Sequence, residues 1–290
     1  MESQANFRRM VLGLPHSARD YVSVAFTAEL ADLLGLDLVG IFAEDEELID
    51  LALLPCVREF RFSGNGWHRL EVEQLARSAS QAVAEARRLF ADAAQARRVG
   101  VRFDIVKGKI GDAIGSQSTP DDIIVVIEPQ NPAERVTYQF MRFMELALNA
   151  QSAALLVPSR VSRRKGPVVA VASSEHDASI QVGLKIAETV REKLLILSPT
   201  IADRSMADRL AAGTAVHIHQ QSLRCDEIGL AELGSVLATV GERLVVMSRG
   251  SDPLFPARLA SEQGVPVLVA GRSKLLARTM DSPVLTDLVR

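Results

Sequence analysis

The sequence is poor in cysteine, which excludes one class of fold. Its 290 residues contain only Cys56 and Cys225, far apart and without the Cys-x-x-Cys spacing of zinc sites and redox motifs. A disulfide framework is therefore not indicated, and a reducing compartment fits. The first ten residues also lack the succession of basic, apolar and small residues that marks a signal peptide. We expect a cytoplasmic protein.

A basic surplus and a long apolar run are also missing. The 33 lysines and arginines are outnumbered by 36 aspartates and glutamates, whereas a protein that binds duplex DNA through many phosphates normally carries an excess of positive charge. No apolar run approaches the roughly 18 residues that span a bilayer. We therefore expect no nucleic acid as main partner and no insertion into a membrane.

The sequence does contain a regular alternation of short apolar runs and amphipathic segments, typical of a folded α/β protein. Helical spacing of apolar residues predicts helices between the runs, including a long helix that ends at Gly100 and another over 135–149. Strands separated by helices indicate a parallel sheet covered on both faces. The strands of the first half are predicted at 10–14, 37–43, 101–106, 123–127 and 153–157.

The same order of elements restarts after a basic segment, RVSRRKGP at 160–167. We interpret this segment as a solvated linker between a domain of residues 1–159 and a second of residues 168–290, although its charge could also attract an anionic partner. An order preserved across two halves indicates duplication. The second copy is shorter, with a helix predicted at 205–212 in place of the long one. Its strands are predicted at 168–172, 193–197, 215–219, 243–247 and 265–270.

Together these features resemble the universal stress protein family in its tandem two-domain form. The resemblance covers residues 8–158 and, more weakly, 167–271. It rests on the strand order, on KGKIGDAIGSQSTPDDIIVV, on the fifth-strand phrases AALLVPS and VPVLVAG, and on GIFAEDEELIDLALLP. It implies two adenine nucleotide alpha hydrolase-like domains, each an open parallel five-stranded sheet of order 3-2-1-4-5 with helices on both faces. Tandem copies of this family usually pair through their fifth strands.

The nucleotide-binding signature of that family is missing. Nucleotide-binding members carry an Asp just after strand one, where this chain reads LPHS at 14–17 and SSE at 173–175. They also carry a loop after strand four with Gly, two residues, Gly, nine residues, then Gly with Ser or Thr. In the second copy that loop reads SRGSDP at 248–253, with one glycine out of register. In the first copy the signature positions fall on Glu128, Asn131, Met141 and Arg142.

The turn at 128–132 is poorly suited to a triphosphate. Phosphate binding there uses backbone N–H groups that converge at the start of a helix, and Pro129 and Pro132 each remove one donor. Glu128 beside a phosphate would be opposed by roughly 4 kcal/mol at 4 Å for an effective dielectric constant of about 20. We therefore predict no ATP bound in the family manner.

Topology alone suggests which residues could line a binding crevice, because open α/β sheets bind ligands at the carboxyl ends of their strands. His16 could act there as an acid, a base or a donor to an anion, but no partner nucleophile is evident. The glycines of GKIGDAIG at 108–115 match no phosphate loop and predict a strand-to-helix turn capped by Asp112. The crevice candidates are Pro15, His16, Ser17, Phe42, Lys109, Glu128, Asn131 and Arg135.

A metal site is not predicted. His217 and His219 share one face of a strand, but a third ligand at useful spacing is not visible. We expect this strand at a sheet edge, where polar residues protect against edge pairing.

An insertion at 44–66 interrupts the first copy after its second strand. It predicts a short helix broken at Pro55, an extended piece and a loop at SGNG, 63–66. Two hypotheses stay open: the insertion packs onto its own domain, or it folds over the crevice as a lid or a partner-docking surface. It carries an apolar face of Leu48, Leu51 and Ala52, together with Phe60, Phe62 and the following Trp67.

We therefore expect a non-enzymatic protein similar to universal stress proteins, acting in stress response or regulation by binding an unknown protein partner or small ligand. No catalytic residue, metal or cofactor is predicted, and a homodimer is compatible with the pattern. One alternative is an adenine-nucleotide sensor for ATP or AMP, with Arg135 or Lys109 supplying charge to an altered pocket. Another is an enzyme or flavin-binding member of the same fold group, although its H-x-G-H, S-G-G-x-D-S and glycine-rich flavin segments do not occur here.

Overall fold

The computed structural model describes residues 7–14, 21–44, 46–54, 56–61, 66–97, 99–198, 210–223 and 229–270. Contacts divide the chain into two compact units. The N-terminal unit comprises residues 9–118 and 124–147, and the C-terminal unit comprises residues 1–8, 119–123 and 148–290. The strand at 153–157 thus groups with the C-terminal unit. The division into domains of residues 1–159 and 168–290 remains a prediction.

The N-terminal unit is built on parallel strands that are apolar because both of their faces are covered. β1 (Arg9–Leu14) pairs with β2 (Asp37–Glu44), and β2 pairs with β5 (Val101–Lys107). β6 (Asp122–Ile127) lies on the other side of β1, which gives the order β6-β1-β2-β5. The predicted order of the first four strands is confirmed.

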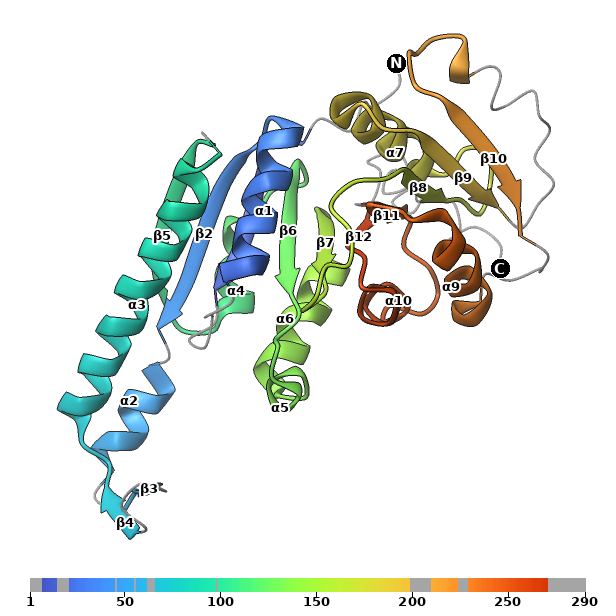
Figure 1. Ribbon diagram of the computed structural model, residues 1–290. Coiled ribbons are helices and arrows are strands. Elements are labelled where there is room, and N and C mark those ends of the chain that lie inside the picture. Colours follow the sequence, from blue (N-terminus) through green and yellow to red (C-terminus); the bar gives the residue numbers. More distant parts are fainter. Residues whose placement is uncertain are drawn as a thin grey trace, which may run out of the picture. The chain divides into compact units, whose positions relative to one another are not determined.

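Helices cover both faces of this sheet (Figure 1). α1 (Tyr21–Leu34) and α3 (Val72–Gln95) pack together on one face, and α4 (Ile110–Gln117) and α6 (Tyr138–Asn149) lie on the other. Gly13 in β1 lets the second pair approach closely: a Cβ atom there would lie 2.8 Å from Ile114 and 2.9 Å from Phe143.

Two predictions about helix ends in this unit are wrong. The helix predicted from about 135 to 149 is α6, which begins only at Tyr138, and a separate short helix, α5 (Pro132–Arg135), precedes it. They separate because Thr137 accepts a hydrogen bond at Oγ1 from the Phe140 amide, 3.4 Å, as a capping threonine does. Asp112 does not cap α4 but lies in its first turn, and Lys109 is the N-cap residue.

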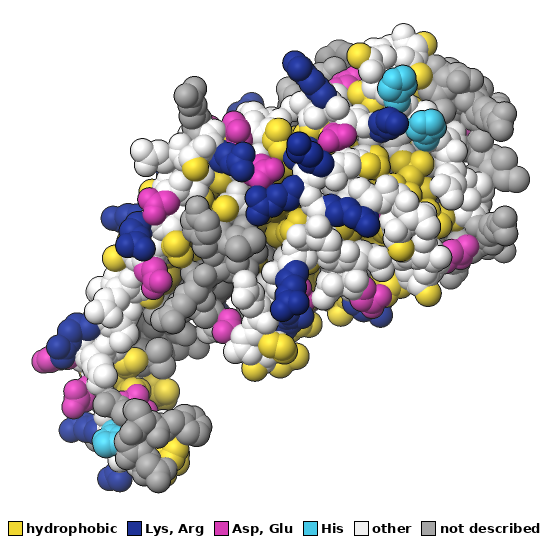
Figure 2. Space-filling view, in the orientation of Figure 1, with side chains coloured by type: hydrophobic (Ala, Val, Ile, Leu, Met, Phe, Trp, Pro, Cys, Tyr) yellow, Lys and Arg dark blue, Asp and Glu magenta, His cyan; other side chains and the backbone are white. Residues whose placement is uncertain are grey.

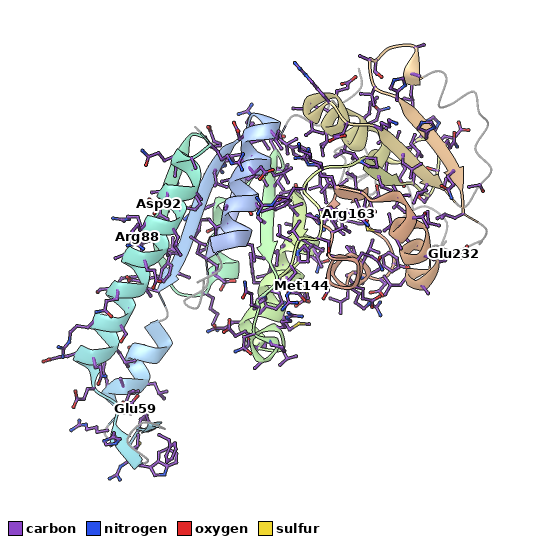
Figure 3. All side chains as sticks on the ribbon, viewed as in Figure 1. Glu59, Arg88, Asp92, Met144, Arg163 and Glu232 are labelled. Atoms are coloured by element: carbon purple, nitrogen blue, oxygen red, sulfur yellow. The ribbon has the colours of Figure 1, made fainter. Side chains whose placement is uncertain are left out.

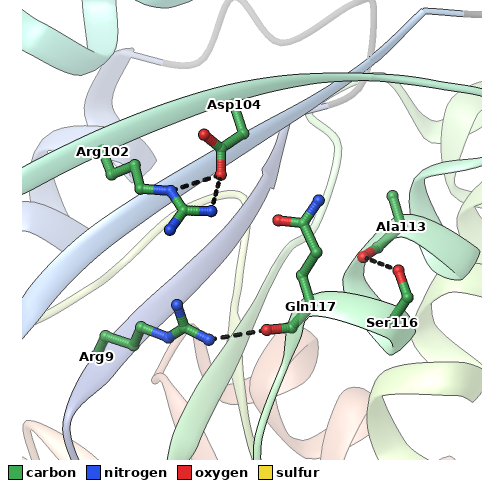
Figure 4. A network of polar contacts seen from close by, with 6 residues as sticks. All are labelled: Arg9, Arg102, Asp104, Ala113, Ser116 and Gln117. Atoms are coloured by element: carbon green, nitrogen blue, oxygen red, sulfur yellow. Dashed lines mark hydrogen bonds and ion pairs between the residues drawn. The ribbon is translucent and has the colours of Figure 1, made fainter.

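Polar contacts fasten the amino-terminal edge of the same sheet. Arg9 donates a hydrogen bond to the carbonyl of Gln117, 2.8 Å, at the carboxyl end of α4 (Figure 4), where a cation also complements the helix dipole. Arg102 pairs with Asp104 nearby, 2.7 Å from its Nε. These arginines are thus engaged in contacts away from the carboxyl ends of the strands, where the crevice is expected.

The C-terminal unit repeats the same order of strands. β8 (Val168–Val171) lies between β9 (Leu194–Ser198) and β11 (Leu244–Met247), β10 (Ile218–Ser222) follows β9 at the edge, and β12 (Val267–Val269) follows β11. This is the predicted order 3-2-1-4-5. The third strand is displaced from its predicted position at 215–219. The helix predicted at 205–212 falls mostly outside the described residues.

The fifth strands of the two copies pair, as the resemblance implies. β7 (Ala153–Val157) runs antiparallel to β12, with Leu155 opposite Leu268. Both strands are buried. α7 (Ala178–Val190) packs on β8, β9 and β11, whereas α9 (Leu230–Val240) and α10 (Phe255–Gln263) pack against each other.

The basic linker is held to the C-terminal unit, although its arginine and lysine side chains are exposed as predicted. The Ser162 amide donates to the Gly264 carbonyl, 2.8 Å. Arg163, labelled in Figure 3, lies 3.6 Å from the carboxylate of Glu242. Gly166 has a φ of +133°, and a Cβ atom there would meet the Gly241 carbonyl oxygen at 2.2 Å. The linker backbone is therefore packed rather than free.

Candidate functional site

The turn after β6 is held together by its own arginine. Arg135 Nη1 lies 2.9 Å from Glu128 Oε1, and Arg135 Nε donates to the Pro129 carbonyl, 2.8 Å. Both charged side chains are partly buried, with 31% of Arg135 and 18% of Glu128 exposed. The guanidinium that would supply charge to a nucleotide in the adenine-nucleotide alternative is thus engaged by a carboxylate and a backbone carbonyl.

Asn131 has a structural role in the same turn. Its Oδ1 accepts a hydrogen bond from the Ala133 amide, 3.0 Å, and it is the N-cap residue of α5. Pro132 follows at the first helical position, where the missing N–H has no intrahelical partner to lose. The residues of this turn that would have to bind a ligand are therefore engaged in contacts within the turn.

The structure describes only Phe42 and Lys109 among the other crevice candidates. Phe42 is buried in β2, with 1% exposed, and Lys109 is exposed at the start of α4. Pro15, His16 and Ser17 lie outside the described residues. The structure thus brings together Glu128, Asn131 and Arg135, and the remaining candidates stay predictions.

The corresponding edge of the C-terminal unit contains a carboxylate that sequence reasoning missed. Asp177 follows β8 and is the N-cap residue of α7, with Oδ1 accepting from the Ser179 amide at 2.9 Å. Its Oδ2 accepts from both the amide and the hydroxyl of Ser173, at 2.9 and 2.8 Å. The hydroxyl of Ser248, the first residue after β11, donates to Oδ1. The carboxylate therefore joins the ends of the first and fourth strands.

Asp177 is ionised at neutral pH despite its burial. Burial alone would raise the pKa of this carboxyl, but the hydrogen bonds from Ser248, Ser173 and Ser179 outweigh it and hold the pKa below its usual value of 3.8. A second anion such as a phosphate would meet a buried negative charge here. The sequence alone could have predicted Asp177 as an N-cap residue, because it stands just before an apolar helical pattern. It could not have predicted the hydrogen bond to Ser248, because that bond depends on which strands are neighbours in the sheet.

The two histidines of the third strand lie where the edge prediction places them. His219 is on β10 and His217 directly precedes it, both exposed at the edge of the sheet of their unit. Within the described ranges, no three His, Cys, Asp or Glu side chains are grouped closely enough to hold a metal ion. The same part of the chain contains no helix that is long and apolar enough to cross a membrane.

The insertion forms a helix and a hairpin that stand apart from the main sheet. α2 (Glu46–Leu53) is followed by β3 (Arg58–Arg61) and β4 (Gly66–Arg69), which pair only with each other among the described strands. The predicted helix is confirmed, and the extended piece is one strand of a hairpin that was not predicted. We call residues 46–83, which include the start of α3, the arm. In Figure 3, Glu59 on the hairpin lies near the amino-terminal end of α3, whereas Arg88 and Asp92 lie in the other half of that helix.

Apolar side chains are exposed on the arm and on the turn between α5 and α6. On the arm, hydrophobic groups lie among charged ones (Figure 2); Trp67 is 65% and Leu53 is 64% exposed. On the turn, Val136 is 79% and Tyr138 is 74% exposed. Large apolar side chains that stay in water mark candidate binding surfaces.

Comparison with known proteins supports the fold. No model of a protein family and no curated protein matches the sequence. The structure is similar to that of a universal stress protein from Archaeoglobus fulgidus DSM 4304, with a TM-score of 0.62, 13% identity, and coverage of 94% of this chain and 100% of that one. A putative universal stress protein from Pseudomonas aeruginosa UCBPP-PA14 gives a TM-score of 0.47 at 12% identity, covering 96% and 98%. The chain thus has the fold of the universal stress proteins.

Proposed function

We propose that this protein is a non-enzymatic member of the universal stress protein fold group, which acts in stress response or regulation by binding a protein partner or small ligand. Neither unit, in this proposal, holds ATP as nucleotide-binding universal stress proteins do. One observation carries it: each unit places a carboxylate, already bound by donors of the protein, at the carboxyl ends of its central strands. These are Glu128, paired with Arg135, and Asp177, bound to Ser248.

Physical chemistry supports this proposal in two ways. A phosphate at either place would have to displace charged hydrogen bonds, which contribute more to stability than neutral ones. It would also meet a like charge in a partly buried setting, where Coulomb repulsion is weakly screened. The prolines at 129 and 132 remove amide donors that could offset these costs.

The first test is native mass spectrometry of the protein purified gently from its own cells, followed by denaturing analysis of any released molecule. We expect a retained partner protein or a ligand other than a nucleotide. An adenine nucleotide at near-unit occupancy would overturn the proposal and favour nucleotide sensing. A visible flavin absorbance would favour the flavin-binding alternative instead.

Thermal melting separates the proposal from the adenine-nucleotide alternative. ATP and AMP at millimolar concentration are expected to leave the melting temperature unchanged. If they raise it saturably, and if this effect is lost when Asn131→Asp is combined with Arg135→Ala, the altered-pocket alternative is correct. Asn131→Asp suits this purpose because aspartate keeps the capping acceptor for the Ala133 amide and adds only charge. Arg142→Ala, which removes an exposed partner of Glu145, is the matched control.

A further inference from the structure

The arm consists of segments that do not pack on the N-terminal sheet. The 24 residues of α3 make a helix of about 36 Å, whereas the seven residues of β5 span about 23 Å. The buried residues of α3 all lie in its second half, from Ala86 onward. The first half therefore extends past the sheet and packs against α2 (Figure 1).

The hairpin of the arm is too small to be stable by itself. β3 and β4 have four residues each and form a sheet separate from the main one. Phe60 and Trp67 are directly opposite in register, and their rings meet edge to face with centroids 5.4 Å apart. A two-stranded hairpin is marginal in water unless something packs on it.

Exposed apolar side chains are concentrated on this segment. Of the eleven large apolar side chains exposed in the described residues, five lie within residues 51–67. The arm is also long enough to supply the roughly 20–30 residues a side that a specific protein interface uses. The five side chains are Leu51, Leu53, Leu54, Phe60 and Trp67.

Charge on the arm is divided between its two parts. The helix α2, EELIDLAL, carries three acidic residues and no basic one, and VREFRFSGNGWHRL at 57–70 carries three arginines and one histidine against one glutamate. Asp50 on α2 is exposed, as are Arg58 and Arg69 on the hairpin. Among the described residues, these three form no ion pair.

We propose that the arm is a self-association surface, which pairs with the arm of a second copy of this chain. A two-fold axis would place the acidic α2 of each copy against the basic hairpin of the other, so that one charge pattern is satisfied twice. The exposed apolar side chains would meet between these charged parts. A uniformly charged partner, such as a nucleic acid or an anionic membrane, would be repelled by α2.

Sedimentation velocity of the full chain at increasing concentration tests the surface. We expect a dimer that Trp67→Glu weakens at least about tenfold, and that Leu53→Glu also weakens. Tyr138→Glu, at an equally exposed site outside the arm, should not change it. Circular dichroism of each variant controls for folding. A chain that stays monomeric, or a dimer that Trp67→Glu does not weaken, overturns the proposal, as does Trp67-dependent binding to anionic vesicles in place of dimerisation.

Charge reversal tests the pairing itself. An Asp50→Lys chain and an Arg69→Glu chain should each self-associate weakly, because like charges would face each other twice. Mixed together they should form a heterodimer, since both contacts then join opposite charges. A mixture no tighter than either variant alone overturns the proposed pairing.

Discussion

Ser248 donates a hydrogen bond to Asp177, although 71 residues separate them in the chain. Val171 and Met247, the last residues of β8 and β11, are paired in register, and this bond lies just beyond them. It joins the turns after the first and fourth strands, which a ligand at this edge would have to separate. The bond therefore stabilises the unit and, in the proposed function, occupies the place where a phosphate would bind.

Asp177→Asn is expected to destabilise the protein at neutral pH by about 1–3 kcal/mol. The amide has one acceptor oxygen where the carboxylate has two, so donors from Ser173 or Ser179 lose their partner. Urea unfolding, followed by circular dichroism, measures the loss. Glu188→Gln, at an exposed position on α7, is the control and should leave the midpoint unchanged.

The depressed pKa of Asp177 predicts a loss of stability in acid. In the folded state burial is outweighed by the hydrogen bonds from Ser248, Ser173 and Ser179, which bring the pKa below the usual 3.8. Such a group contributes stability above its unfolded pKa, about 4, and the contribution is lost as pH falls through the folded pKa. The urea midpoint of the wild type should fall below about pH 4, and that of D177N should fall less. Equal acid slopes would contradict this role.

The raised pKa of Glu242 predicts the opposite pH dependence of stability. Burial raises its pKa above the usual 4.5, and hydrogen bonds from the backbone and the charge of Arg163 offset burial only in part. A raised pKa means that the folded state binds the proton more tightly, so stability falls as pH rises through the folded pKa. Glu242→Gln should therefore match or exceed the wild type at neutral pH, with a gap that narrows toward pH 4 or so. A less stable variant at neutral pH would show that pairing with Arg163 dominates.

Much of the fold could be predicted because its strands are buried on both faces and read as apolar runs. Residues 153–157 were placed at their observed limits. The third strand of the second copy was displaced because its polar edge sequence, VHIHQ, carries little of that signal. The hairpin was missed although the sequence Asn65-Gly66, a strong hairpin signal, runs into the start of β4.

The candidate sites were less accessible to sequence reasoning. Glu128 and Arg135 were both named, but their ion pair depends on how the turn at 128–132 leads into α5, which apolar spacing does not reveal. Asp177 depends on Ser248, which only the pairing of β8 with β11 brings near. Local patterns predict elements, whereas contacts between distant turns require the strand register.

Gly166→Ala tests the packing of the linker. A Cβ atom at Gly166 would lie 2.2 Å from the Gly241 carbonyl oxygen, a backbone atom that cannot move without disturbing the loop. At Gly241 the φ is also positive, +74°, but the nearest atom is 3.4 Å away on the Arg163 side chain. We expect Gly241→Ala to cost about 1 kcal/mol from backbone strain alone. Gly166→Ala should cost about 3 kcal/mol or more. Equal losses in urea unfolding would mean that the linker is not packed.

Glu128→Gln is expected to create weak affinity for ATP in the N-terminal unit. The substitution removes the carboxylate that holds Arg135 and opposes phosphate, so the guanidinium becomes available to an anion. Loss of a repulsion of a few kcal/mol would strengthen binding at least about tenfold. The prolines still withhold two amide donors, so affinity should remain weak. Isothermal titration calorimetry measures the gain, and Glu145→Gln, which removes the exposed partner of Arg142, is the matched control. If Glu128→Gln gains nothing, or if Glu145→Gln gains as much, the ion pair is not what keeps ATP out.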